Sequence, residues 1–182
     1  KGQNELQFDA DLKAAQKIAN DNFKIKLESL VLPRNQFNAK YITIAKQNGI
    51  KVVRSNPDVW FWKKVNKLTP FIRAIDSVFP VSNRLTYSFN NDKEILLLPA
   101  SRFLRAFSMH EKYIHKLKLR RIKKEMLYAA KNSNVYHLWW HPHNFGYSLK
   151  ENIIFLENIL KEYQILNKKY DFQSSTMIEM YK

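Results

Sequence analysis

The amino-acid sequence predicts an α/β domain in which helices alternate with the short strands of a parallel sheet or barrel. The main observation is the alternation itself, because short apolar segments are separated by longer stretches with helical periodicity. Composition agrees, since 45% of the 182 residues are hydrophobic and the chain has neither an internal repeat nor a linker rich in Pro, Gly or Ser. We therefore expect one domain over residues 1–182.

The expected elements follow from apolar spacing and from the residues that end helices and strands. Phe8, Leu12, Ala15 and Ile18 recur at helical spacing near the start of the chain. Ser148, with Glu151 three positions later, predicts a capping box at the start of the last helix. The expected helices span residues 7–22, 39–48, 64–79, 108–131 and 149–168, and the expected strands span 27–32, 50–54, 94–98 and 135–141, with a loop over 81–93.

Composition also limits the classes of partner and cofactor. Three glycines leave no glycine-rich loop for phosphates, so nucleotide cofactors are not expected. Without cysteine there are no disulfides and no thiolate metal ligands, but a cysteine-free protein suits reducing and oxidising compartments alike. No apolar run is long enough for a membrane span. The chain begins at Lys1, without Met or a signal segment, and we expect further residues to precede it in the natural protein.

The net charge of +15 makes a polyanion a competing partner. Between Arg102 and Lys131 stand ten Lys or Arg and only two Glu. Apolar residues such as Leu119, Ile122 and Met126 recur through this segment, as in a half-buried amphipathic helix with a solvated basic face. No known nucleic-acid reader motif accompanies the charge, so nucleic acid is not the expected partner.

Polar residues follow each of the predicted strands. Catalytic groups of parallel α/β proteins gather where strands end, at the carboxyl edge of the sheet. Four ends finishing in Arg, Asn or His therefore predict a catalytic or ligand-binding cleft there. The four polar ends are Arg34-Asn35-Gln36 with Asn38, Arg54-Ser55-Asn56 with Asp58, Ser101-Arg102 with Arg105, and His141 with His143 and Asn144.

The segment 135–141 is the most informative of these strands. Its alternation places His137, Trp139 and His141 on one face and Leu138 and Trp140 on the other. An imidazole at a strand end suits proton transfer, because it titrates near neutral pH. Two close histidines are also compatible with half of a metal site, but zinc needs at least three protein ligands.

For several other residues the sequence is compatible with both a structural and a functional role. Arg34 is either a surface charge after a turn or a functional group. Trp60 and Trp62 are each either a core residue or a platform for a sugar ring, and His137 suits a hydrogen-bonded position in the core.

Four strings of the sequence resemble, in order, the later part of one protein family. They are SLVLPRNQ (residues 29–36), GIKVVRSN (49–56), PASRFLR (99–105) and HLWWHPHNFG (137–146), of which the last is the most specific. The family is the bacterial polysaccharide deacetylases of the NodB-homology group, which is carbohydrate esterase family four. The likeness spans nearly the whole chain.

The resemblance implies a fold, a reaction and a set of site residues. The fold is an irregular (β/α)7 barrel, incomplete here at its N-terminus. The reaction is metal-dependent hydrolysis of an N-acetyl amide on a polysaccharide or cell-surface glycan, a carbon–nitrogen bond that is not a peptide bond. By resemblance His141 protonates the departing amine and Arg34 orients the catalytic base. The residues assigned to substrate binding are Asp58, Trp60, Arg102, Leu138, Trp139, His143 and Asn144.

The chain also departs from the family pattern. The first two motifs, which supply the base and the ligands of a divalent metal expected to be zinc, would lie before Lys1. The resemblance thus assigns no metal ligand to this chain and implies that the fragment is inactive alone. An incomplete barrel would leave an open sheet edge that favours self-association. The compartment stays open between bacterial cytoplasm and cell envelope, and the alternative function is a non-catalytic carbohydrate- or polyanion-binding basic domain.

Overall fold

A computed structural model describes residues 3–32, 38–63, 66–76, 78–79, 81–82, 84–88 and 94–181. The chain divides into two compact units. Unit 1 comprises residues 1–56, 90–98 and 175–182, and unit 2 comprises residues 57–89 and 99–174. None of the described helices combines the length and apolar character that crossing a bilayer requires.

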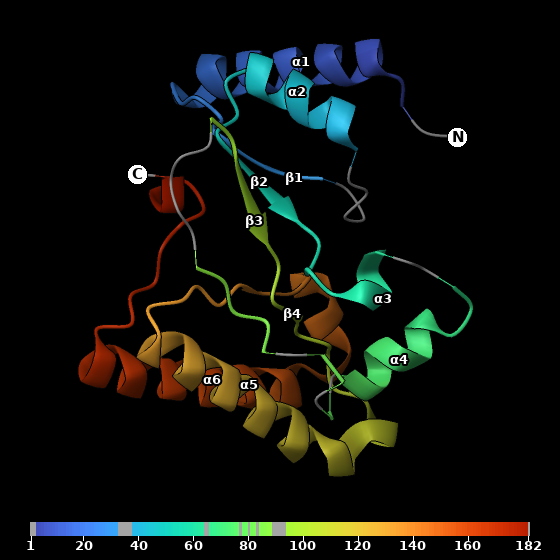
Figure 1. Ribbon diagram of the computed structural model, residues 1–182, viewed down its shortest axis with the longest axis vertical. Coiled ribbons are helices and arrows are strands. Elements are labelled where there is room, and N and C mark those ends of the chain that lie inside the picture. Colours follow the sequence, from blue (N-terminus) through green and yellow to red (C-terminus); the bar gives the residue numbers. More distant parts are fainter. Residues whose placement is uncertain are drawn as a thin grey trace. The chain divides into compact units, whose positions relative to one another are not determined.

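Unit 1 packs two helices against a small sheet (Figure 1). Helices α1 (Glu5–Phe23) and α2 (Ala39–Gln47) accompany strands β1 (Ser29–Val31), β2 (Val52–Ser55) and β3 (Leu96–Pro99), and the short helix η4 (Glu179–Tyr181) lies near the C-terminus. The strand order is β1-β2-β3, and β1 and β2 run parallel. Apolar side chains from both helices and the strands form one core, which consists of Phe8, Leu12, Leu32, Ala45, Ile50 and Val53.

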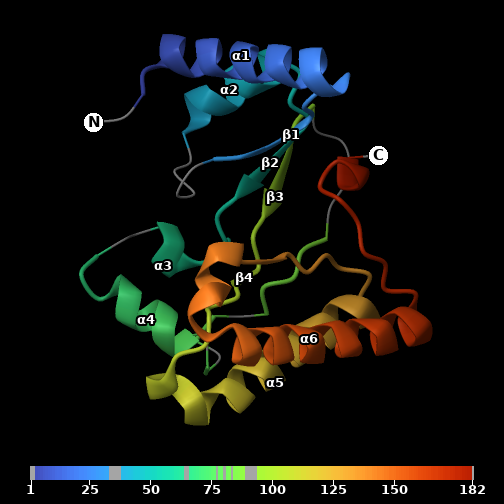
Figure 2. The same ribbon diagram turned by 180° about the vertical axis from the view of Figure 1, so that it is seen from behind.

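Unit 2 is built around two long helices, α5 (His115–Lys131) and α6 (Leu149–Tyr170), which lie side by side (Figure 2). Ile122 and Met126 of α5 and Ile159 and Leu166 of α6 belong to one buried cluster. Strands β4 (Arg102–Phe103) and β5 (Leu138–Trp139) pair in parallel. The shorter elements are α3 (Trp60–Lys63), α4 (Thr69–Asp76) and the 3-10 helices η2 (Met109–Ile114) and η3 (Pro142–Ser148).

Most of the expected elements are present, with corrections at their ends. The expected helix 64–79 is replaced by α3 and α4, and the N-terminal part of the expected helix 108–131 is the 3-10 helix η2. The prediction of a capping box at Ser148 is wrong, because η3 runs directly into α6 and the Ser148 side chain caps no backbone group. A capping box does start α1, formed by Asn4 and Gln7. The described strands form two small sheets, and the seven-unit barrel stays a prediction.

Four charged side chains of unit 2 form a buried ionic network. Arg102 donates from Nε and Nη2 to both carboxylate oxygens of Glu125, at 2.9 and 2.7 Å. Its Nη1 donates to the backbone oxygen of Asp76 at 3.1 Å. Arg121 donates to Asp76 at 3.2 Å and to Glu125 at 3.3 Å. The side chains of all four are less than 10% exposed, so two cations and two anions neutralise each other in the interior.

The network changes the titration of the groups that it contains or touches. Burial alone would lower the pKa of the Arg102 guanidinium, but the hydrogen bonds and charge of Glu125 outweigh burial and raise it. Burial and the negative charge of Glu125 raise the pKa of Tyr136 well above its ordinary value of 10.0. The Tyr136 hydroxyl therefore stays protonated and donates to Glu125 at 3.0 Å. Arg102 and Tyr136 thus keep Glu125 hydrogen-bonded on two sides.

The substitution Glu125→Gln should destabilise the protein by about 3 kcal/mol, because it leaves buried guanidinium charge without its counter-charge. The matched control is Glu162→Gln, which removes a carboxylate paired with Lys123 at 3.1 Å on a more exposed part of the surface. That change should cost less than about 1 kcal/mol. Urea unfolding of the three proteins measures the difference, and equal losses would show that the network does not stabilise unit 2.

His115 should make the stability depend on pH. Its ring is buried against Phe107 and Phe155, with centroid distances of 4.5 and 5.2 Å. Burial, with the charge of Lys118, lowers the pKa of His115 below 6.5, against a smaller opposing effect of Glu111. The unfolded chain therefore binds the proton more tightly, and the contribution of neutral His115 is lost as the pH falls from about 6.5 toward the folded pKa.

In urea unfolding at about pH 7.5 and about pH 5, His115→Gln should lose less stability on acidification than the wild type does. His110→Gln, which replaces an exposed histidine, is the control and should behave like the wild type. An unchanged pH dependence in His115→Gln would be evidence that other groups cause the acid sensitivity.

Candidate functional site

A cavity of about 400 Å³ lies at the carboxyl ends of β4 and β5 in unit 2. The two strands are in register through the pairs Arg102 with Leu138 and Phe103 with Trp139. The backbone N–H groups of Ser101 and Leu104 donate to the carbonyl oxygens of His137 and Trp139 at 2.9 and 2.8 Å. This ladder brings two of the four predicted polar strand ends together. Ser101, Arg102 and Arg105 of the first end line the cavity, whereas the second end, at His141, lies next to the lining residue Trp139.

Aromatic rings and guanidinium groups make up much of this wall. Phe103 and Trp139 contact each other with ring centroids 4.5 Å apart. Across the lining, Arg73 lies over the Trp62 ring with 3.7 Å from Cζ to the centroid. Arg105 lies on the rim, 44% exposed, and pairs with Glu111 at 3.3 Å. The cavity therefore offers flat apolar surfaces next to hydrogen-bond donors.

Arg73 retains donor capacity inside this cavity. Its Nη2 donates to the carbonyl oxygen of Phe61 at 3.3 Å. Its buried Nε has no hydrogen-bond partner among the described residues. Burial lowers the pKa of this guanidinium below its ordinary value, although an arginine stays charged at any physiological pH. A buried donor without a partner is costly, and a ligand oxygen would relieve that cost.

His141 stands just beyond the end of β5. Its ring centroid lies 5.5 Å from that of Trp139, 5.8 Å from that of Phe103 and 5.2 Å from that of His143, which is stacked on it. The side chain is exposed, and within the described part of the chain it contacts aromatic rings and no carboxylate. Its imidazole is thus open to solvent beside the aromatic wall, where it can exchange a proton with a ligand.

The strand alternation predicted for residues 137–141 is confirmed at the positions that contacts define. Trp139 and His141 contact each other on the cavity side. Leu138 packs against the core cluster of α5 and α6 instead, and Trp140 stacks on Phe145 of the same cluster. Of the two residues of β5, both assigned to substrate binding by the resemblance, Trp139 lines the cavity and Leu138 faces the helices.

The other predicted site residues lie at varied distances from this cavity. Arg102 lines it, but its side chain is only 8% exposed and its guanidinium is bound by Glu125 and Asp76. Trp60 is 57% exposed and stands edge-on to Phe61, which does line the cavity. The backbone N–H of Asp58 donates to the Tyr87 hydroxyl at 3.3 Å. Arg34, expected to orient a base, lies outside the described residues.

The second histidine and the asparagine belong to η3, which begins directly after His141. His143 is exposed, and its ring is stacked on that of His141. Asn144 donates its backbone N–H to the His141 carbonyl at 3.0 Å. This bond turns the chain away from β5, so Asn144 contributes to the position of His141.

Sequence reasoning missed Arg73, Asp76 and Glu125, whereas Trp62 was one of the two tryptophans considered as a platform for a sugar ring. Glu125 carried a signal, because it is one of two acids among the basic residues 102–131 and lies three positions after the apolar Ile122. A lone carboxylate on the apolar face of a helix indicates a buried partner of opposite charge. For Arg73 the sequence held no such signal, because its position depends on the contact with Trp62, which joins α4 to α3.

The described residues include no group of three or more His, Asp or Glu side chains placed to hold a metal ion. His141 and His143 supply two imidazoles, which is fewer than a zinc site uses. The residues described here therefore do not by themselves fit a divalent metal, and no chemical step is assigned to one.

Comparisons of the chain with protein-family models, with curated proteins and with solved structures found no match. The functional assignment therefore depends on the residues of the strand-end cavity and on the four sequence strings described above.

Proposed function

We propose that the chain is part of a carbohydrate N-deacetylase, which hydrolyses an N-acetyl amide on a polysaccharide or cell-surface glycan. One observation carries the proposal: His141 stands beside a cavity of aromatic rings and guanidinium groups at the ends of two parallel strands. The resemblance of the strings 99–105 and 137–146 to the deacetylase family supports it, because these strings contain β4, β5 and His141.

The lining suits a sugar. The faces of Phe103, Trp139 and Trp62 are flat and apolar, and they match the apolar faces that a pyranose ring presents between its hydroxyl groups. Arg73 and Arg105 provide donors for hydroxyl or carbonyl oxygens at the same cavity. A volume of about 400 Å³ is within the usual range for small-molecule sites.

In the proposed reaction His141 is the general acid. Water adds to the acetyl carbonyl carbon, the carbon–nitrogen bond then breaks, and the departing amine takes a proton from the imidazolium of His141. Acetate and the free amino sugar are the products. An exposed imidazole beside the aromatic wall can reach a leaving group held there and can be reprotonated from solvent. The activation of the water is not assigned to the described residues.

A non-catalytic carbohydrate-binding domain is the second candidate. It is favoured by one observation, since the His141 side chain has no carboxylate partner among the described residues to orient it. Such a partner is common for histidines that act in proton transfer. A binding domain would use the same aromatic lining and would not need His141 to change its protonation.

The substitution His141→Ala should lower the rate of acetate release by about 10²-fold to 10⁴-fold, the usual contribution of a general acid. The assay uses the natural gene product that contains this sequence, an N-acetylated glycan and added divalent metal ions. His110→Ala, at an exposed position on η2, is the matched control and should keep the wild-type rate.

Two results would overturn the deacetylase proposal. One is the absence of metal-dependent acetate release from N-acetylated glycans, and the other is a His141→Ala variant with the wild-type rate. If glycan binding then persists in His141→Ala but is lost in Trp139→Ala, the carbohydrate-binding domain is the better assignment.

A further inference from the structure

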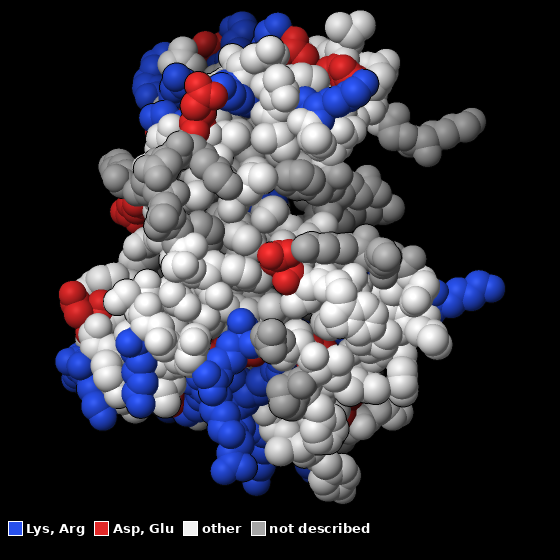
Figure 3. Space-filling model, viewed as in Figure 1, with Lys and Arg blue, Asp and Glu red and all other residues white. Residues whose placement is uncertain are grey.

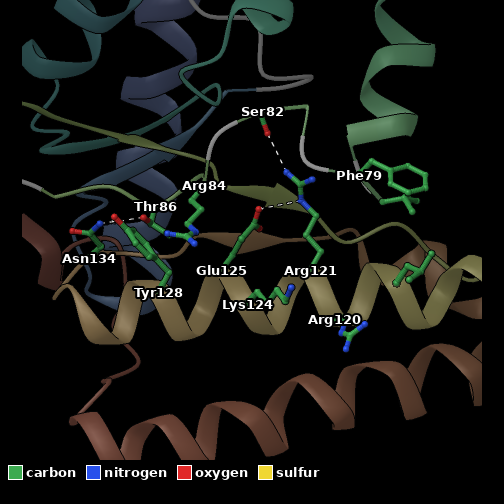
Figure 4. Close-up of a pocket in the computed structure, with 12 residues that line it drawn as sticks. Phe79, Ser82, Arg84, Thr86, Arg120, Arg121, Lys124, Glu125, Tyr128 and Asn134 are labelled. Atoms are coloured by element: carbon green, nitrogen blue, oxygen red, sulfur yellow. Dashed lines mark hydrogen bonds and ion pairs between the residues drawn. The ribbon is translucent and has the colours of Figure 1, made fainter.

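A second and larger cavity, of about 740 Å³, also lies within unit 2. It is bounded by α5 on one side, and the lining on the other side includes Val78, Phe79, Ser82, Arg84 and Thr86. In Figure 4, Arg121 and Glu125 rise from α5 toward Ser82, Arg84 lies above Tyr128, and Phe79 stands at the opposite end. The residues that line this cavity include neither His141 nor any residue that lines the strand-end cavity. The proposed deacetylase chemistry therefore does not account for this second cavity.

The lining carries uncompensated positive charge. The charges of Arg121 and Glu125 are balanced within the ionic network. Arg84, Arg120 and Lys124 form no ion pair with any carboxylate among the described residues. Lys and Arg side chains also gather on the surface over the long helices of unit 2 (Figure 3). A cavity with excess cations and low-dielectric walls concentrates anions.

One buried donor in the wall has no acceptor. The Arg121 side chain is 9% exposed, and its Nε and Nη2 donate to Glu125 at 3.3 Å and to Ser82 at 3.3 Å. Its Nη1 is buried without a hydrogen-bond partner among the described residues. In Figure 4 the nitrogen of Arg121 that carries no dashed line points toward the end where Phe79 lies. A guanidinium donor left unpaired in this way is a position for a ligand oxygen.

The same cavity has one ordered cation and one apolar end. The Arg84 guanidinium is stacked over the Tyr128 ring, with 4.3 Å from Cζ to the centroid, which holds its donors in place. Phe79 and Leu117 also line the cavity and are 61% and 41% exposed. Exposed apolar side chains in a concave site are typical of surfaces that a ligand covers.

We propose that this cavity binds an organic phosphate, with its phosphate or diphosphate group at Arg84, Arg121 and Lys124 and an apolar group against Phe79 and Leu117. Phosphate suits these donors because it carries up to two negative charges and three terminal oxygens, which guanidinium groups bind in a forked geometry. The excess of three cations over the balanced network also favours a dianion over a single carboxylate.

Isothermal titration calorimetry of the full chain tests this site with three probes: hexyl phosphate, inorganic diphosphate and hexanol. Hexyl phosphate should bind measurably and more tightly than the other two, because it alone uses both ends of the cavity. Arg84→Gln and Lys124→Gln should each weaken it by about tenfold, the usual effect of one charge-assisted hydrogen bond. Phe79→Ala should weaken hexyl phosphate but leave diphosphate unchanged.

Lys116→Gln is the matched control, since it removes the same charge from an exposed position of α5 outside this lining. It should change the affinity by less than about twofold, and His141→Ala should leave the affinity unchanged whether or not the protein is a deacetylase. The proposal is overturned if hexyl phosphate does not bind or binds no better than diphosphate. It is also overturned if Lys116→Gln and Lys124→Gln weaken binding equally, which would indicate a diffuse polyanion surface instead.

Discussion

The buried ionic network of Arg102, Asp76, Arg121 and Glu125 is the constraint on which unit 2 depends. Its members come from β4, from the end of α4 and from α5, so one set of hydrogen bonds fixes a strand and two helices together. Two charges of each sign leave no net charge in the interior. Desolvation offsets much of the Coulomb attraction in such a network, and its main effect is to permit one arrangement of the elements.

Both cavities of unit 2 share this network as part of their walls. Asp76 and Arg102 line the strand-end cavity, whereas Arg121 and Glu125 line the larger cavity of about 740 Å³. A wall in which nearly every donor is already paired is rigid, and ligand groups next to it meet side chains that need little reorganisation. Nε of Arg73 and Nη1 of Arg121, which have no hydrogen-bond partner within the described part of the chain, therefore identify the places where a ligand can add a hydrogen bond.

The sequence predicted the elements with strong periodicity and missed what depends on distant partners. Helices α1 and α6 follow from apolar spacing, and the two faces of β5 follow from alternation. The cap at Ser148 failed because a preceding 3-10 helix, which the sequence did not indicate, supplies the start of α6. The sequence predicted Arg102 as a polar strand-end residue that binds substrate, but in the structure its guanidinium is bound by Glu125, a residue 23 positions away.

Arg102 and His141 show that burial determines which polar side chains near the strand ends remain available to a ligand. Arg102 is the first residue of β4 and His141 lies just beyond β5, yet the Arg102 side chain is buried and bound by Glu125, whereas the His141 side chain is exposed. His141 keeps that exposure because its neighbours Leu138 and Trp140 are held on the other face by the core of α5 and α6. A shift of one residue in β5 would exchange the faces and bury the imidazole. The apolar anchoring of alternate residues therefore determines which side chain at this edge can exchange protons with a ligand.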